Sequence, residues 1–119
     1  MKRRSVIVYI QDVLDSIQRA EGYLEGMSIE GFRTDRKTFD AVVRNIEVVG
    51  EAIKRVPESV TSKYPDIAWH KAAGMRDVLI HDYPDIVIDI VYATVKEHFP
   101  ILREQMLEVK KDLETDIAE

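Results

Sequence analysis

The sequence predicts an all-α fold, an up-and-down bundle of four to five helices. Apolar residues recur at three- and four-residue spacing along most of the chain, which is the periodicity of helices that bury one face. The single strand-like run, at 6–10, continues directly into helical spacing. The chain has 119 residues, and a second independent core is implausible at that length, so we expect one domain over 1–119.

The first helix is expected over 5–26, where apolar side chains share one face. Residues 28–35 are expected to form a loop, with Thr34 or Asp35 as the N-cap of the next helix. The stripe of the first helix comprises Ile10, Val13, Leu14, Ile17, Leu24 and Met27.

The second helix follows this cap and ends before Pro57, because a proline disfavours helical geometry at the residue before it. Gly50 lies inside the helix, where glycine costs about 1 kcal/mol relative to alanine. Close approach of a neighbouring helix is one explanation, and a tolerated defect is the other. The apolar stripe comprises Phe39, Val42, Val43, Ile46, Val49 and Ile53.

The remaining elements are separated by prolines. Residues 57–68 are expected to form a connection with room for one short helical turn, and a third helix is expected over 69–80. Pro84 suits the first position of a fourth helix. Pro100 either kinks the fourth helix or begins a fifth.

Composition excludes several classes of protein. There is no cysteine, so disulfides, zinc–thiolate sites and thiol catalysis are ruled out. The N-terminal apolar run stops at Gln11, too early for a signal peptide, and no apolar segment approaches the ~20 residues that span a bilayer. We therefore expect a cytoplasmic protein without membrane association. The net charge of −5 argues against a broad basic surface, so any contact with a nucleic acid would require a local cationic cleft.

The third helix interrupts its own pattern. Its apolar face should pass through position 76, but Arg76 stands there, and Tyr83 lies further along the same face. A buried unpaired cation is strongly unfavourable, so Arg76 needs a partner or water. An ion pair with Glu47 or Glu51 of the second helix is one interpretation; a functional site is the other.

His81 follows Arg76 by five residues, about 140° around a regular helix, so the two would not face each other on an undistorted helix. Pro84 disfavours helical geometry at Tyr83, and we expect the helix to unwind around 81–83. His81 then lies at a helix C-terminus, where the dipole favours its protonated form. It is either a C-terminal stabiliser or a catalytic group.

These three residue types together suit one reaction. The planar guanidinium of Arg76 matches a phosphate, His81 can exchange protons near neutral pH, and Tyr83 offers a hydroxyl and a stacking surface. RNA can be cleaved without a metal when its own 2′-hydroxyl attacks the adjacent phosphate. That reaction needs proton transfer and stabilisation of charge on the phosphate.

The segment from Arg76 to Tyr83 resembles the R-x4-H-x-Y signature of HepT toxins, a branch of the HEPN superfamily. The similarity extends over about 7–107, which makes the short motif far more specific than it would be alone. The surrounding segments that also resemble the family are Gly50-Glu51-Ala52, the approach from Tyr64 to Trp69, the lead-in Gly74-Met75, and the exit from Val95 to Pro100.

The resemblance implies a homodimeric helical bundle with the two motif copies near a shared cleft. It implies a metal-independent endoribonuclease without a cofactor, a growth-arresting toxin that acts on RNA, with Arg76 and His81 as catalytic residues. It also implies a cognate antitoxin, a small nucleotidyltransferase of the MNT type. In this family the antitoxin can silence the toxin by transferring AMP to the motif tyrosine, here Tyr83.

A non-catalytic accessory subunit is the first alternative. HEPN-like bundles also occur as partners of nucleotidyltransferases, and Arg76 and Tyr83 would then serve an interface. Such a protein would bind its partner tightly without cleaving RNA.

A carboxylate-bridged metal bundle is the second alternative. Glu47 and Glu51 lie four residues apart on one helical face, and three histidines are present. Such bundles usually carry Glu-x-x-His on two helices, and this sequence has none, so no metal site is expected. His70 is expected near the start of the third helix and His98 at the surface.

Overall fold

The computed structural model describes the backbone of residues 3–81 and 84–118 and the side chains of 5–75 and 87–116. Over these ranges the chain is helical and contains no strand, which confirms the predicted all-α fold. The elements, in chain order, are α1 (Arg3–Tyr23), α2 (Ile29–Arg33), α3 (Arg36–Lys54), α4 (Glu58–Thr61), α5 (Trp69–His81), α6 (Pro84–Ala93), the π-helix η1 (Thr94–His98) and α7 (Phe99–Ala118).

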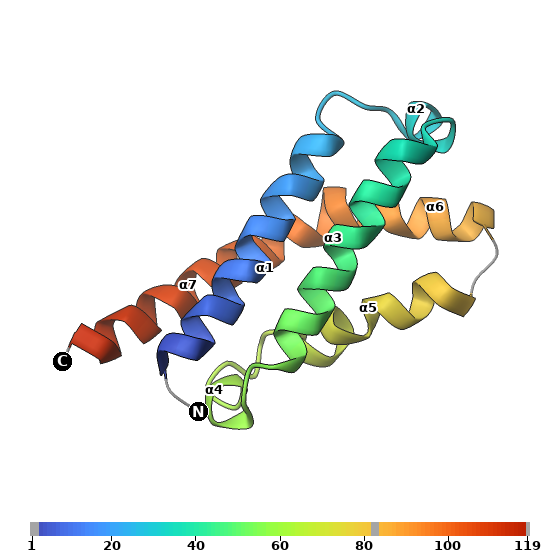
Figure 1. Cartoon of the computed structure of the whole chain (residues 1–119). Coiled ribbons are helices and arrows are strands. Elements are labelled where there is room, and N and C mark those ends of the chain that lie inside the picture. The colour runs from blue at the N-terminus through green and yellow to red at the C-terminus, as the bar shows by residue number, and fades with distance from the viewer. Residues whose placement is uncertain (1–2, 82–83, 119) are drawn as a thin grey trace.

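Long helices that reverse direction build the bundle (Figure 1). α1 and α3 lie side by side and antiparallel, while α6, η1 and α7 form one extended rod that crosses behind them. α5 packs against the C-terminal half of α3. The predicted stripes supply the core, whose largest fully buried side chains are Phe32, Phe99, Ile10, Ile17, Leu24, Ile46, Met106, Val6, Val13, Val42, Val49 and Val91.

The segment between α1 and α3 contains a short helix, so the predicted loop is wrong for the residues of α2. Ser28 caps this helix by accepting a hydrogen bond from the Gly31 N–H at 3.1 Å. Phe32 is buried, and its ring centroid lies 5.8 Å from those of Phe39 and Tyr92. Burial of this one aromatic side chain stabilises the folded conformation of the segment.

Asp35 is the N-cap of α3, which confirms one of the two predicted caps. Its carboxylate accepts a hydrogen bond from the Thr38 N–H at 3.0 Å and another from the Thr38 hydroxyl at 2.7 Å. These hydrogen bonds, the backbone one above all, hold the pKa of Asp35 below its ordinary value of 3.8. The charged carboxylate therefore stabilises the start of α3.

The C-terminal end of α1 is attached to the α6–α7 rod. Gly26 adopts a φ of 73°, the left-handed conformation that commonly ends a helix. The Tyr92 hydroxyl donates to the Met27 carbonyl at 2.7 Å, and Lys96 Nζ donates to the Leu24 carbonyl at 3.0 Å. A cation at this end also complements the helix dipole, so α1 and η1 are held in a fixed relation.

The rod contains a π-helical turn directly before Pro100. The Phe99 N–H bonds to the Thr94 carbonyl five residues earlier, and the Thr94 hydroxyl donates to the Ile90 carbonyl at 2.7 Å. A proline ring inside an α-helix collides with the carbonyl four residues back, and a wider turn relieves that collision. Of the two predicted outcomes, the structure favours a new helix, because α7 begins at Phe99, one residue before Pro100.

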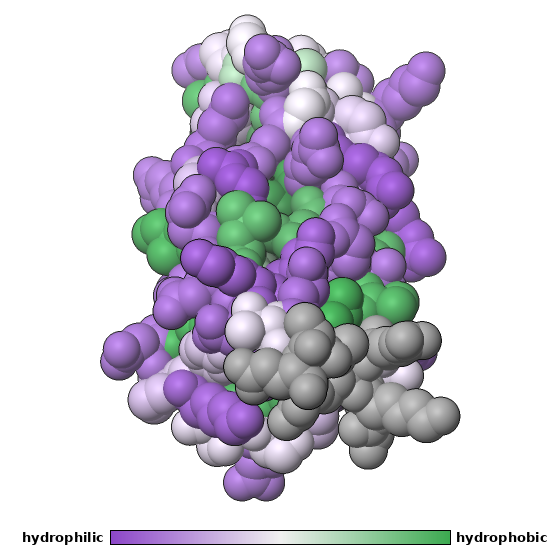
Figure 2. Space-filling view, turned by 90° about the vertical axis from the view of Figure 1, so that its left-hand side faces the viewer, coloured by the Kyte–Doolittle hydropathy of each residue, from purple (hydrophilic) through white to green (hydrophobic). Residues whose placement is uncertain are grey.

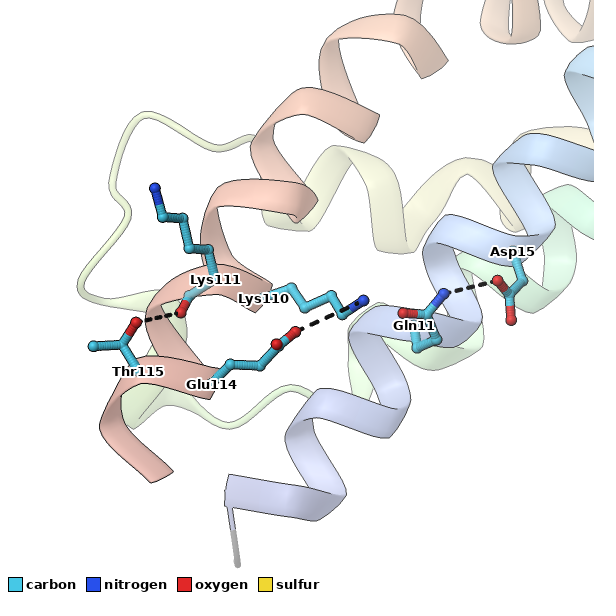
Figure 3. Close-up of polar contacts among 6 residues, drawn as sticks. All are labelled: Gln11, Asp15, Lys110, Lys111, Glu114 and Thr115. Atoms are coloured by element: carbon cyan, nitrogen blue, oxygen red, sulfur yellow. Dashed lines mark hydrogen bonds and ion pairs between the residues drawn. The ribbon is translucent and has the colours of Figure 1, made fainter. Parts of the chain in front are cut away.

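The face formed by α1 and α7 is mainly hydrophilic, with apolar side chains gathered near its middle (Figure 2). The polar contacts drawn in Figure 3 each lie within one helix. The Gln11 amide donates to Asp15 at 2.8 Å, and Lys110 lies 3.7 Å from Glu114. Pairs of this kind support a helix locally. In the described part of the chain, no helix is long and apolar enough to cross a bilayer.

Candidate functional site

α5 carries the sequence motif. It begins at Trp69 and is described to His81, which confirms the predicted third helix over 69–80. Arg76 lies in the second half of α5, and His81 is the last residue of the helix as described. The side chains of Arg76 and His81, and Tyr83 altogether, lie outside the described residues, so their mutual geometry stays a prediction.

The start of α5 is fixed by the connection that precedes it. The Trp69 indole N–H donates to the Tyr64 carbonyl at 3.1 Å. The Tyr64 hydroxyl in turn donates to Asp112 of α7 at 2.6 Å. Burial raises the pKa of Tyr64, and the hydrogen bond to Asp112 raises it further. The tyrosine therefore stays protonated as a donor and ties this connection to α7.

α5 approaches α3 closely at Gly50. A Cβ atom at this position would lie 3.2 Å from the Ala73 carbonyl oxygen and 3.7 Å from that of Ala72. The first of these distances is shorter than ordinary van der Waals contact. Of the two predicted explanations for this glycine, close approach of a neighbouring helix is confirmed. The crossing lies three residues before Arg76, so it sets where the motif-bearing half of α5 begins.

The acidic residues proposed as partners of Arg76 lie on α3. Glu47 is 3.7 Å from Arg44, and Glu51 borders a cavity of about 260 Å³ that Arg44 and Arg55 also line. An ion pair between Arg76 and either glutamate involves a side chain outside the described residues and stays a prediction. Within the described ranges, no three His, Asp or Glu side chains gather closely enough to hold a metal ion.

Two adjacent cavities border α5 on the side that faces η1. They measure about 250 Å³ and about 420 Å³, and Lys71, Met75 and His98 line both. His98 is exposed and His70 lies at the start of α5, as the sequence predicted, and His70 is exposed as well. These cavities could not be predicted from the sequence, because Lys71 and His98 are 27 positions apart along the printed chain and border the same cavities only in the folded molecule.

Comparison with known proteins decides the family. Residues 13–109, which include the whole motif, match the family model described as Ribonuclease HepT-like. The chain belongs to the HepT-like ribonuclease family. The resemblance drawn from the motif is thereby confirmed. The family consists of ribonucleases, which are enzymes that act on RNA.

Several relatives of this HepT-like chain carry RNase or ribonuclease in their names. A Methanocaldococcus jannaschii protein named as an RNase is 34% identical over 114 residues, which cover 96% of this chain and 94% of that one. A Thermococcus cleftensis protein named "Probable ribonuclease HepT" is 35% identical over 109 residues, covering 92% and 99%.

A second Methanocaldococcus jannaschii protein, whose name combines a gamma-glutamylcyclotransferase with an RNase, is 36% identical over 112 residues. The alignment covers 94% of this chain and 50% of that protein, so the chain spans half of that relative. No solved structure matches the HepT-like chain significantly.

Proposed function

We propose that this chain is the metal-independent endoribonuclease toxin of a HepT/MNT-type toxin–antitoxin pair, with Arg76 and His81 as its catalytic residues. One observation carries the proposal: the family match spans 13–109, and the R-x4-H motif within that span lies on α5. The tight crossing at Gly50 supports it, because a helix held by its backbone is a rigid platform for catalytic side chains.

The reaction follows from the two side chains and the substrate itself. A neutral His81 accepts the proton of the 2′-hydroxyl as the 2′-oxygen bonds to phosphorus. The bond from phosphorus to the 5′-oxygen breaks, that oxygen takes a proton from water, and His81 returns its own proton to the solvent. The products are a 2′,3′-cyclic phosphate and a 5′-hydroxyl end. Arg76 donates hydrogen bonds to the phosphate oxygens while negative charge builds up on them.

Regulation in this proposal runs through Tyr83. A nucleotidyltransferase antitoxin transfers AMP from a nucleoside triphosphate to the tyrosine hydroxyl, and pyrophosphate leaves. The added phosphate places negative charge beside Arg76 and His81, where it repels the RNA backbone. We further propose that the toxin is a homodimer that acts in the cytoplasm, with the two motif copies near a shared cleft.

The test is cleavage of a tRNA pool in the presence of a chelator. The parent protein, first shown to carry no AMP, is compared with the Arg76→Ala, His81→Ala and Tyr83→Ala variants. His70→Ala is the matched control, because His70 is an exposed histidine at the other end of α5. We expect the parent and the control to cleave, and His81→Ala and Arg76→Ala to lose cleavage.

Two outcomes would contradict the proposal. A folded, unmodified parent that leaves RNA intact but binds a nucleotidyltransferase would make the chain an accessory subunit. Cleavage that survives in His81→Ala would place the catalytic group elsewhere.

A further inference from the structure

The two cavities beside α5 share three lining residues, and together we call them the α5–η1 groove. The smaller cavity lies toward α7, where Phe99, Ile101 and Leu102 line it. The larger lies toward α6, where Ile90 and Ala93 line it. Lys71, Met75 and His98 line both cavities and therefore lie between them.

Two local features bring the basic residues to the groove. His98 is the last residue of the π-turn that precedes Pro100, and Thr94, the first residue of that turn, also borders the larger cavity. Lys71 and Met75 lie four residues apart and so share one face of α5. Both Lys71 and His98 are exposed, so a ligand can reach them from solvent.

The groove combines apolar walls with two basic residues that border both of its cavities. An apolar wall suits the flat face of a nucleobase, and an ammonium group suits a phosphate oxygen. Among the described residues that line the groove, the one acid is Asp66, and it borders only the smaller cavity. The chain as a whole has a charge of −5, so a nucleic acid needs a local site of this kind to bind.

We propose that the α5–η1 groove is a subsite for a nucleotide of single-stranded RNA near the cleaved phosphate, with Lys71 and His98 binding its backbone. The inference rests on the proposed function, because the groove reaches Met75, the residue before Arg76. Lys71 precedes Arg76 by five residues, about 7.5 Å along a helix axis and about 140° around it. A strand held at Arg76 therefore passes around α5 to the groove, which holds a nucleotide beyond the one that adjoins the cleaved phosphate.

Binding to a short single-stranded RNA tests the subsite. The probe carries 2′-O-methyl groups, so it cannot be cleaved through its own 2′-hydroxyl and reports affinity alone. Lys71→Gln, His98→Gln and the double variant are compared with the parent over a series of salt concentrations. Lys63→Gln and His70→Gln are matched controls, because both residues are exposed, carry the same side-chain types and lie outside the groove.

We expect Lys71→Gln to bind about fivefold more weakly at about 0.1 M salt and its log–log salt dependence to be shallower by about 0.7, the loss of one phosphate contact. The double variant should bind more weakly still, and the controls should bind like the parent. Equal affinity of all six proteins would overturn the subsite, as would equal losses in the controls, since net charge alone would then explain them. A changed oligomeric mass in the groove variants at unchanged RNA affinity would show that a second copy occupies the groove.

The cleavage assay separates failure of the subsite from failure of the proposed function. If the parent cleaves RNA and the groove variants bind as the parent does, only the subsite is wrong. If the parent does not cleave and the groove variants still lose affinity, the groove binds RNA and the catalytic proposal is wrong.

Discussion

The two faces of α3 pack against their neighbours in different ways. α1 and α3 pack along each other, and each buries aliphatic side chains, such as Ile17 and Val49. Toward α5, the contact is made by Gly50 against the backbone of Ala72 and Ala73. Burial of apolar side chains stabilises the first interface, whereas the second brings two helices close together. This close approach fixes where a helix lies, and α5 also borders an open groove.

This comparison predicts that substitutions on the two faces affect different properties. Changes toward α1 should lower stability and leave activity per folded molecule intact. Changes toward α5 should do the reverse.

The largest effect is expected from Ile17→Ala, on the buried face of α1. Ile17 is 0% exposed, and removing its side chain should lower the free energy of unfolding by about 2–5 kcal/mol. Urea denaturation measures the difference. Val8→Ala on the same helix is the control, because Val8 is 56% exposed and its truncation should change stability by less than about 0.5 kcal/mol. Equal losses of unfolding free energy in both variants would show that burial does not decide how much a side chain of α1 contributes to stability.

Gly50→Ala tests the interface between α3 and α5. The added methyl group would press on the Ala73 carbonyl and displace α5 by a few tenths of an ångström. Because catalytic geometry tolerates little displacement, we expect kcat for RNA cleavage to fall about tenfold, with a change in unfolding free energy under about 1 kcal/mol.

Gly22→Ala serves as the control for Gly50→Ala, because nothing lies within 4 Å of a Cβ atom at that position. It should retain full activity and equal or exceed the parent in stability. A Gly50→Ala protein that unfolds much more easily yet cleaves at the parent rate would assign the crossing to stability instead.

The smallest effect is expected from Asp35→Asn, at the start of α3. Asparagine keeps a capping oxygen but loses the charge, so the parent should be slightly more stable at neutral pH. The pKa of Asp35 is lowered in the folded state, so its contribution is present above the ordinary value of 3.8 and is lost as the pH falls through the lower folded value. Melting temperatures of the two proteins should therefore converge as the pH is lowered below about 4. A difference that persists in strong acid would show that the charge of Asp35 does not contribute.

Most of the fold could be predicted because its determinants are local. The stripes of α1 and α3, the cap at Asp35 and the boundaries around Pro57 and Pro84 all follow from spacing and backbone chemistry within a few residues. The placement of Arg76 and His81 on a helix could be predicted for the same reason, because it follows from an apolar stripe and a nearby proline.

The features that could not be predicted depend on contacts between residues that are far apart in the sequence. α2 is ordered by Phe32, whose ring meets Tyr92 of α6, and no pattern near Phe32 indicates that contact. The groove forms only once the folded chain places Lys71 of α5 and His98 of η1 beside the same cavities. The π-turn that carries His98 could be anticipated in part from Pro100, although the sequence left a kink and a new helix as alternatives.

The attachment of α1 to the α6–α7 rod bears on the order in which the molecule can fold during synthesis. Arg103 pairs with Glu21, and Tyr92 and Lys96 bond the carbonyls at the end of α1. Each contact joins the first quarter of the chain to its last third, so the ribosome must release nearly the whole polypeptide before any of them can form. Until then α1 exposes the apolar face that α7 later covers. A growing chain that already displays α5 thus lacks the helices that complete the bundle.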